Sequence, residues 1–250
     1  MKKFKTTMLL VLLLLAPIFT YAQDMYVIQE DIVKLSKVKE YEALVKEFVT
    51  LTKKHNLQDV SWITLSTNTS HYLYISPIKN MAALDEESYG AKLAAKAGKD
   101  VVSNLYKRAD QYTETELSYI VHLDKELTYM PNGFTQTPAG KNFRKQHLLY
   151  VSPENRAIVK EKMKAVKALF ERKGSKEYYR VYRSGFGTVG DYYLVAIAAV
   201  DELDYARQSK ENDALLGEEG KKVLGDLFSS LLKYEVVLGN IRPEFSYSPK

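Results

Sequence analysis

Tyrosine and arginine side chains alternate along one segment in the second half of the chain. Tyr178, Arg180 and Tyr182 stand two residues apart, so in an extended strand all three project from the same face. Large rings around one fixed positive charge can bind an aromatic or anionic ligand. The alternative is core packing, with Arg180 paired to a protein carboxylate. Such a pair would make Arg180 structural, whereas a guanidinium facing a cavity without one would make it a ligand anchor.

A comparable set of aromatic residues lies in the first half of the chain. Trp62 is the only tryptophan, and Tyr72 and Tyr74 share one face of a predicted strand. We expect any pocket to lie between a sheet and its helices, with residues of a central hairpin in its wall. The predicted ligand-binding residues are Trp62, Tyr72, Tyr74, Tyr178, Arg180 and Tyr182.

A glycine-rich motif at residues 185–190 matches G-x-G-x-x-G letter for letter. A dinucleotide site needs a helix to open directly after this motif, but residues 191–195 resemble a strand. A kinase glycine-rich loop needs a following Val-Ala-Ile-Lys, and Ala198 stands where that lysine would be. We therefore interpret the motif as a hairpin turn, where glycine reaches positive φ without strain.

The sequence shows no pattern typical of a metal site or of a cysteine or serine nucleophile. The four histidines, His55, His71, His122 and His147, do not have the spacing of metal ligands. The chain contains no cysteine, which excludes disulfides and thiol nucleophiles. No G-x-S-x-G elbow is present. We predict no metal and no cofactor from these patterns.

The two halves of the chain resemble each other. Residues 98–106 match 220–228 in residue class, and residues 126–131 match 244–249 in the same order. The second match aligns Tyr129 with Tyr247 and repeats a glutamate three residues earlier. The repeated pair could form two related polar sites, or it could fix two strand ends, which the prolines that follow favour. A duplicated unit predicts two similar domains about a pseudo-two-fold axis.

Each half is predicted to follow the order β-α-β-β-α-β. The expected strands are 26–33, 60–66, 71–78 and 116–129, then 143–151, 178–183, 192–200 and 234–247. One helix ends near Asn56 and its counterpart at Gly174; the later helices span 91–109 and 215–232. The domains are 23–131 and 142–250, joined by a linker at 132–141. Because residues 193–200 are apolar on both faces, we expect two sheets packed face to face, each backed by helices.

This element order resembles the dimeric α+β barrel superfamily, over residues 26–131 and 142–249. Its members include antibiotic-biosynthesis monooxygenases, haem-degrading monooxygenases and NIPSNAP-like proteins. The resemblance implies an α+β fold in which two tandem ferredoxin-like βαββαβ repeats pack sheet to sheet as an intrachain α+β barrel. Haem-degrading members place a histidine ligand on a helix lining the pocket. The helices predicted at 91–109 and 215–232 contain no histidine, which argues against haem.

Residues 1–22 have the pattern of a secretory signal peptide. Three lysines precede an apolar run at residues 8–19, which is short for a bilayer span, and a small-x-small site ends at Ala22. We expect a periplasmic or secreted protein that is not inserted in the membrane after cleavage. The leader lysines account for three of the five net positive charges. The remaining charge gives no reason to expect nucleic-acid binding.

Two functions are consistent with these features. We expect a non-catalytic exported module that binds a small apolar or aromatic ligand, or a protein partner. The alternative is a monooxygenase-like enzyme acting on an aromatic or quinol-type substrate held between sheet and helices. A cofactor-free oxygenase works mainly by positioning and desolvation, so it needs no sequence motif.

Overall fold

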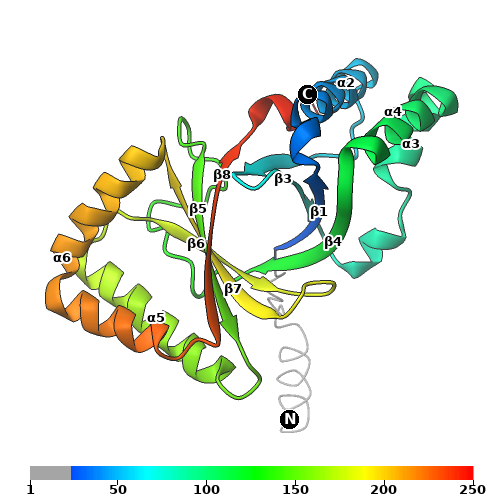
Figure 1. Ribbon diagram of the computed structural model, residues 1–250. Helices are drawn as coiled ribbons and strands as arrows, with labels where there is room; N and C mark the ends of the chain where they lie inside the picture. Colours follow the sequence, from blue (N-terminus) through cyan, green and yellow to red (C-terminus); the bar gives the residue numbers. More distant parts are fainter. Residues whose placement is uncertain (1–23, 250) are drawn as a thin grey trace, which may run out of the picture.

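Eight strands close into one antiparallel barrel with helices packed on its outside (Figure 1). The computed structural model describes residues 24–249, and the predicted signal peptide at 1–22 lies outside the described residues. The strand order is β1-β3-β2-β8-β5-β7-β6-β4, and β4 returns to pair with β1. The α+β class and the barrel agree with expectation. No helix between residues 24 and 249 has the length and apolar character needed to cross a membrane.

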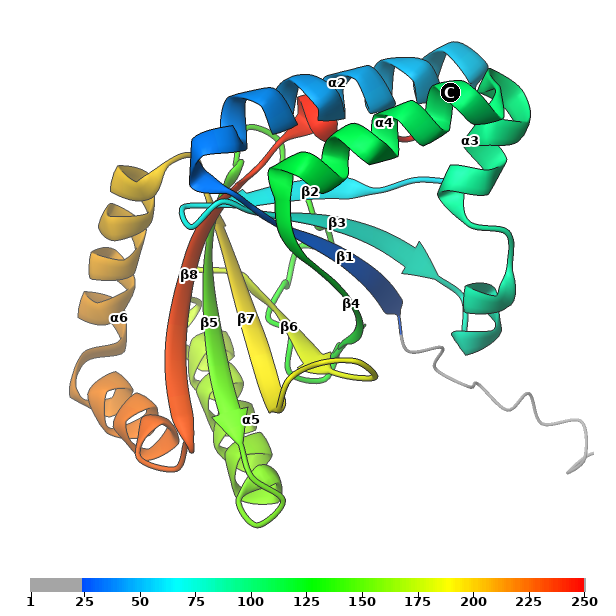
Figure 2. The ribbon, with the colours of Figure 1, turned by 45° about the vertical axis from the view of Figure 1, so that its right-hand side comes forward.

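From residue 24 onward, the first half of the chain supplies four strands and three α-helices. They are β1 (Met25–Val33), α2 (Val38–His55), β2 (Ile63–Thr67), β3 (His71–Ile78), α3 (Tyr89–Ala97), α4 (Lys99–Tyr112) and β4 (Thr113–Leu123). The three helices cover the outer face of their strands (Figure 2). The single helix predicted at 91–109 is wrong, because Gly98 adopts a φ of 99° between α3 and α4. Only glycine takes that conformation readily.

The second half supplies four strands and two helices. They are β5 (Phe143–Val151), α5 (Arg156–Lys173), β6 (Tyr179–Ser184), β7 (Asp191–Ala199), α6 (Glu202–Phe228) and β8 (Lys233–Ile241). The helix predicted at 215–232 begins much earlier, because the Asp201 side chain accepts a hydrogen bond from the backbone of Asp204 and caps it. Gly217, with a φ of 60°, interrupts α6 near its middle.

The strands predicted at 116–129 and 234–247 are too long. In the first, β4 ends at Leu123 and the chain turns, since the Asp124 carboxylate accepts a hydrogen bond from the backbone of Leu127. In the second, β8 ends at Ile241 and a 3-10 turn follows over Pro243–Phe245.

The glycine-rich segment at 185–190 is a hairpin turn between β6 and β7, which confirms its interpretation. Gly187 has a φ of 84°, and a Cβ there would lie 2.7 Å from the carbonyl oxygen of Ser118. The backbone of Ile120 donates a hydrogen bond to the carbonyl of Phe186. The turn therefore packs closely against β4 and leaves no cradle for a phosphate.

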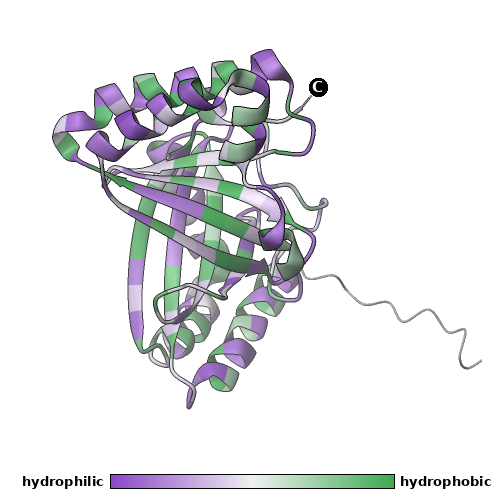
Figure 3. Cartoon of the chain, turned by 90° about the vertical axis from the view of Figure 1, so that its right-hand side faces the viewer, coloured by the Kyte–Doolittle hydropathy of each residue, from purple (hydrophilic) through white to green (hydrophobic). Residues whose placement is uncertain are grey.

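Both faces of β7 are largely buried, as the apolar run at 193–200 predicts, whereas parts of β4 and β8 are exposed. Along β7, Leu194 and Ala196 point into the barrel, while Tyr193 and Ile197 pack against the helices. Figure 3 colours the chain by hydropathy and shows hydrophobic and hydrophilic residues following one another along the strands. The two four-stranded sheets are joined at their edges by short seams, where Leu65–Thr67 pairs with β8 and Val121–Leu123 pairs with β6.

Candidate functional site

Two mainly apolar cavities are formed by the strands and helices of the described residues. One lies inside the barrel, has a volume of about 340 Å³ and is lined by strands of both halves. The other, the outer pocket, has a volume of about 240 Å³ and lies between the second-half strands and helices α5 and α6. Both are mainly apolar with a few polar groups, which is the usual character of small-molecule sites.

The structure divides the six residues predicted to bind a ligand. Arg180 and Tyr182 point into the barrel cavity. Tyr72 and Tyr74 pair with Asp31 and Gln29 of β1 and point outward, toward α2. Tyr74 shares a 2.7 Å hydrogen bond with Tyr41 of that helix.

Trp62 and Tyr178 also lie outside the barrel cavity. Trp62 packs between Tyr89 and Tyr247 at the edge of the first-half helices. Tyr178 stacks edge-on against Tyr129, and its hydroxyl accepts a hydrogen bond from Asn132 of the linker. The six residues therefore do not surround one cavity.

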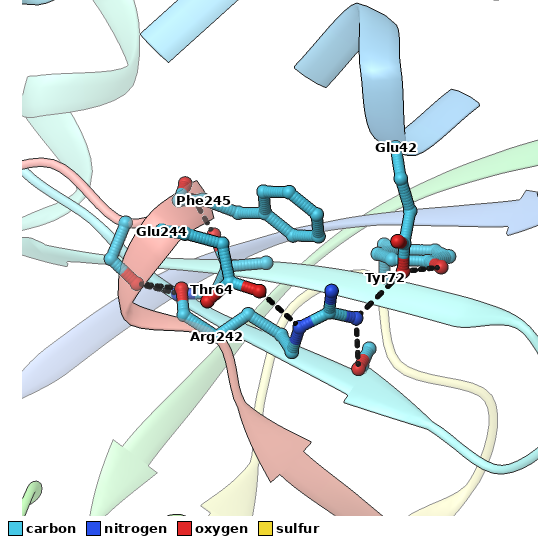
Figure 4. A network of polar contacts seen from close by, with 8 residues as sticks. Glu42, Thr64, Tyr72, Arg242, Glu244 and Phe245 are labelled. Atoms are coloured by element: carbon cyan, nitrogen blue, oxygen red, sulfur yellow. Dashed lines mark hydrogen bonds and ion pairs between the residues drawn. The ribbon is translucent and has the colours of Figure 1, made fainter. Parts of the chain in front are cut away.

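A polar network explains why Tyr72 is held away from the barrel (Figure 4). The Tyr72 hydroxyl donates to a carboxylate oxygen of Glu42, at 2.8 Å, and Arg242 donates to the same oxygen at 2.6 Å. The Arg242 guanidinium also lies 4.3 Å from the centre of the Phe245 ring. Phe245 in turn accepts hydrogen bonds at its carbonyl from Trp62 and Thr64. This network fastens the C-terminal segment to the first half.

The outer pocket is built from alternate positions of the second-half strands and from the facing sides of α5 and α6. Its apolar wall consists of Leu149, Met163, Phe170, Val195, Ile197 and Leu224. Tyr179 and Val181 share the face of β6 that packs against the helices, and Glu177, two residues before β6 begins, lines the same pocket as Tyr179. Two carboxyl groups line the pocket, the exposed one of Asp213 and the buried one of Glu177.

Glu177 is the most perturbed acid of this pocket. Its side chain is nine-tenths buried, and its Oε2 atom has no hydrogen-bond partner in the described structure. Asn212 of α6 approaches the other oxygen at 3.5 Å, too far for a strong bond. Burial, reinforced by the nearby charge of Asp213, raises the pKa of Glu177 to about 7. The carboxyl can therefore both lose and accept a proton near neutral pH.

His147 lies on β5 in the wall of the same pocket. Its Nδ1 atom is 2.6 Å from the hydroxyl of Tyr234, and the two rings are stacked. Burial, with the nearby positive charge of Lys145, lowers the pKa of His147 to about 4. The imidazole is therefore neutral at pH 7 and adds no charge to the pocket.

Sequence reasoning did not single out Glu177, His147 or Asn212 as site residues. The sequence did contain one indication for Glu177. It is spaced two residues before Tyr179 and four before Val181, both of which pack against the helices. A charged residue in a buried phase is a candidate for function. The contribution of Asn212 depends on how α6 docks, which no local pattern reports.

Among the residues from 24 to 249, no cluster of three or more histidine and acidic side chains is arranged to hold a metal ion. Haem does not fit the outer pocket either. Its helical walls α5 and α6 contain no histidine that could ligate the iron. A volume of about 240 Å³ is below the roughly 300 Å³ at which sites for drug-sized ligands begin, and a porphyrin is larger than most such ligands.

Comparison with known structures shows the fold. An anthrone oxidase-like protein matches with a TM-score of 0.60 at 9% identity, over 89% of this chain and 92% of that one. A Fusobacterium nucleatum subsp. nucleatum protein, provisionally named a monooxygenase, matches with a TM-score of 0.57 at 11% identity, over 92% and 100%. A mutant chlorite dismutase from Candidatus Nitrospira defluvii matches with 0.52 at 9%, over 88% and 92%.

These similarities indicate the dimeric α+β barrel fold, as the sequence resemblance implied. No known protein-family profile matches the chain. No curated protein matches it. A shared fold does not establish a shared activity.

Proposed function

We propose that the protein is a monooxygenase-like enzyme that oxidises an aromatic or quinol-type substrate in the outer pocket without a bound cofactor. The observation that carries this proposal is the Glu177 carboxyl, which is buried among apolar side chains with one oxygen free of partners. The anthrone oxidase-like protein and the provisionally named monooxygenase share the fold, which makes this chemistry a reasonable candidate.

Proton abstraction is the step that the pocket favours. An aromatic substrate with an acidic CH₂ or phenolic OH beside Glu177 loses a proton to the Glu177 carboxylate. The resulting carbanion or phenolate is electron-rich and reacts directly with O₂. A base whose pKa is near the working pH transfers protons most efficiently, and about 7 meets that condition for Glu177.

The reaction balances with O₂ as the only co-reactant. For a CH₂ group between two rings, the substrate carbanion adds O₂ and forms a C–O bond, giving a peroxide anion. Glu177 returns its proton to the peroxide, the second C–H proton leaves, and the O–O bond breaks to give a ketone and water. One oxygen atom enters the product, the other becomes water, and all electrons come from the substrate.

The remaining pocket residues exclude water and orient rings. Met163, Phe170 and Leu224 supply apolar surface on the helix side, and Val195 and Ile197 supply it on the strand side. An apolar surrounding prevents quenching of the carbanion by solvent. His147 is neutral and adds no positive charge, and the attraction of Lys145 for the Glu177 carboxylate is outweighed by burial, which raises the pKa of Glu177.

We also infer that the two halves are tandem ferredoxin-like repeats in one chain. The strand order β4-β1-β3-β2 in the first half and β8-β5-β7-β6 in the second supports this. Asn56 and Gly174, which end α2 and α5, both have positive φ, 45° and 65°. We propose export from the cell on the basis of the leader pattern at residues 1–22.

Oxygen uptake with anthrone as substrate tests the proposed reaction. We expect one O₂ consumed for each anthraquinone formed, and a Glu177→Gln rate at least about 100-fold lower, since general bases contribute about 10²–10⁴. Glu171→Gln on the exposed side of α5 is the matched control and keeps the wild-type rate. The uncatalysed oxidation is subtracted at each pH. No uptake by the wild-type protein with either anthrone or its 1,8-dihydroxy derivative would reject catalysis in favour of binding alone.

A further inference from the structure

The barrel cavity has a different chemistry from the outer pocket. Its wall is apolar along most of its length, with Ile28, Ile75, Val121, Leu148, Leu194 and Ala196 from both halves. Its volume of about 340 Å³ is within the range of roughly 300–1,000 Å³ typical of small-molecule sites. Its charged side chains lie toward its two ends, and Gln146 adds one buried amide along the wall.

Two arginines stand at one end of this cavity. Arg144 and Arg180 are each only 3% exposed. Both donate to the same acceptor, the carbonyl oxygen of Gln136, at 2.9 Å. Their guanidinium groups are therefore neighbours, and the side chains line one continuous surface with Tyr182.

Neither guanidinium has a counter-charge among the described residues. Arg180 donates to the carbonyls of Thr135, Gln136 and Ala196, and Arg144 to those of Gln136, Lys141 and Phe143. Five other arginines do form ion pairs with carboxylates: Arg108, Arg156, Arg172, Arg207 and Arg242. Arg183 also lacks a carboxylate partner in the described part of the chain but is exposed to solvent, so Arg144 and Arg180 are distinguished by being buried without one.

Two adjacent cations in a buried place are electrostatically costly. Carbonyl dipoles satisfy N–H groups but do not neutralise charge, and buried charges are normally paired. Burial and the neighbouring Arg180 guanidinium lower the pKa of Arg144 to about 9, which reflects the same cost. A bound anion would remove it, and the planar guanidinium fork suits a carboxylate in particular.

The other end of the cavity carries acidic groups. Glu30 accepts a hydrogen bond from Tyr119 at 2.7 Å and lies 2.6 Å from Nδ1 of His71, while Glu235 accepts one from Tyr150 at 2.8 Å. Tyr150 is six positions from Arg144 along β5, so the two ends are about 20 Å apart at the rise of a strand. Glu235 is paired with Lys233, and Glu30 lies against His71, so within the described structure this end offers an anionic head no unpaired cation, whereas the arginine end offers two.

We propose that the barrel cavity is a second binding site, for an apolar monocarboxylate whose carboxylate contacts Arg144 and Arg180 and whose alkyl body lies along the cavity. The linker at 132–141 forms the floor of this site, because its Thr135, Gln136 and Lys141 carbonyls are held by the two arginines. The ligand's tail points to the acidic end, where Thr69 and His71 are partly exposed to solvent.

Calorimetric titration of the purified protein with octanoate, compared with octan-1-ol, tests this site. The two molecules have the same chain and differ at the head, so we expect octanoate to bind at least tenfold more tightly. Equal binding of the two, or no binding of octanoate, would overturn the proposal. This comparison uses the wild-type protein and does not depend on any variant folding.

Variants then locate the binding. Arg180→Met should weaken octanoate binding at least tenfold and remove the preference over octan-1-ol. Ala196→Leu fills the cavity from the position opposite Arg180 and keeps the backbone carbonyl to which Arg180 donates, so it should abolish binding of both molecules. Glu177→Gln in the outer pocket is the control and should leave octanoate binding unchanged. Loss of binding in Glu177→Gln, with binding intact in Ala196→Leu, would place the ligand in the outer pocket and refute the barrel site.

Discussion

Tyr129 and Tyr247 make the same contact in opposite directions across the molecule. The hydroxyl of Tyr129 donates to the carbonyl of Ser175, two residues beyond α5, and that of Tyr247 donates to the carbonyl of Leu57, two residues beyond α2, both at 2.9 Å. Each tyrosine therefore closes the end of a helix that belongs to the other half.

Removing either hydroxyl should destabilise the fold. Tyr129→Phe and Tyr247→Phe each leave a buried carbonyl without its donor, so we expect each to lower the free energy of unfolding by about 1–2 kcal/mol. The effects should add in the double variant because the two contacts lie at separate places. Urea denaturation gives the measurement.

Tyr193→Phe is the matched control for these substitutions. Tyr193 is equally buried, and its hydroxyl makes no hydrogen bond to another described residue. Its removal should change the free energy of unfolding by less than about 0.5 kcal/mol. A similar loss in all three variants would show that the two cross-half contacts contribute nothing specific.

The raised pKa of Glu177 predicts a stability that declines as pH rises. The folded carboxyl has a pKa of about 7 against an ordinary value of 4.5, so the folded state holds the proton more tightly. This contribution is complete below pH 4.5 and is lost as pH rises through 7. Over the whole pH range the unfolding free energy changes by about 3 kcal/mol for this shift.

Glu177→Gln isolates this effect, because glutamine does not titrate. The difference in unfolding free energy between variant and wild type should shift by about 2–3 kcal/mol in favour of the variant between pH 4 and pH 8. His147 titrates with the opposite sign, since its folded pKa is lowered to about 4, but it contributes equally to both proteins. A flat difference curve would mean that Glu177 is not protonated in the folded protein near neutral pH.

The Arg242–Glu42 ion pair should matter more than a pair on the open surface. Its two side chains are 23% and 27% exposed, and it joins the end of β8 to α2. We expect Arg242→Gln to cost about 1 kcal/mol at pH 7. The Arg242 hydrogen bond lowers the pKa of Glu42, so this stabilisation should fade as pH falls below about 4.5.

Lys221→Gln provides the comparison for that pair. Lys221 and Glu218 are 75% and 88% exposed, and solvent screens their attraction. Thermal unfolding at low and high salt should show almost no change for Lys221→Gln. Equal losses for both variants would contradict a special role for Arg242.

Processing of the leader is a separate prediction. The apolar run and the small residues before Gln23 predict cleavage after Ala22. N-terminal sequencing of protein recovered from the growth medium or periplasm should therefore begin at Gln23. A sequence beginning at Met1, or retention of all the protein in the cytoplasm, would contradict it.

Strand periodicity predicted which side chains share a face within the strands, but not for Tyr178, because β6 begins only at Tyr179. Arg180 and Tyr182 lie on one face of β6, and Tyr72 and Tyr74 lie on one face of β3. Which face is internal could not be predicted, because both faces of these strands carry apolar residues. That choice is made by the pairing of β3 with β1, which places Leu73 opposite Glu30 inside the barrel and Tyr72 opposite Asp31 outside.

The sequence did not indicate the environments of Glu177 and Arg180, because contacts between distant segments of the chain create them. Glu177 is perturbed because α6 covers it, and α6 begins at Glu202, earlier than the apolar pattern suggested. The environment of Arg180 likewise depends on the linker, whose carbonyls it holds. Neither arrangement follows from the residues next to Glu177 or Arg180 in the chain.

The C-terminal segment of each half, with Tyr129 or Tyr247, packs on the other half. The two halves are therefore held together by noncovalent contacts as well as by the linker. A single protease cut between Asn132 and Gly133 would leave two fragments still joined through the sheet seams and through Tyr129 and Tyr247. The two halves therefore contact each other as the two subunits of a heterodimer do, although one chain contains both. Its two fragments, expressed from separate genes, should reconstitute the barrel as a split protein.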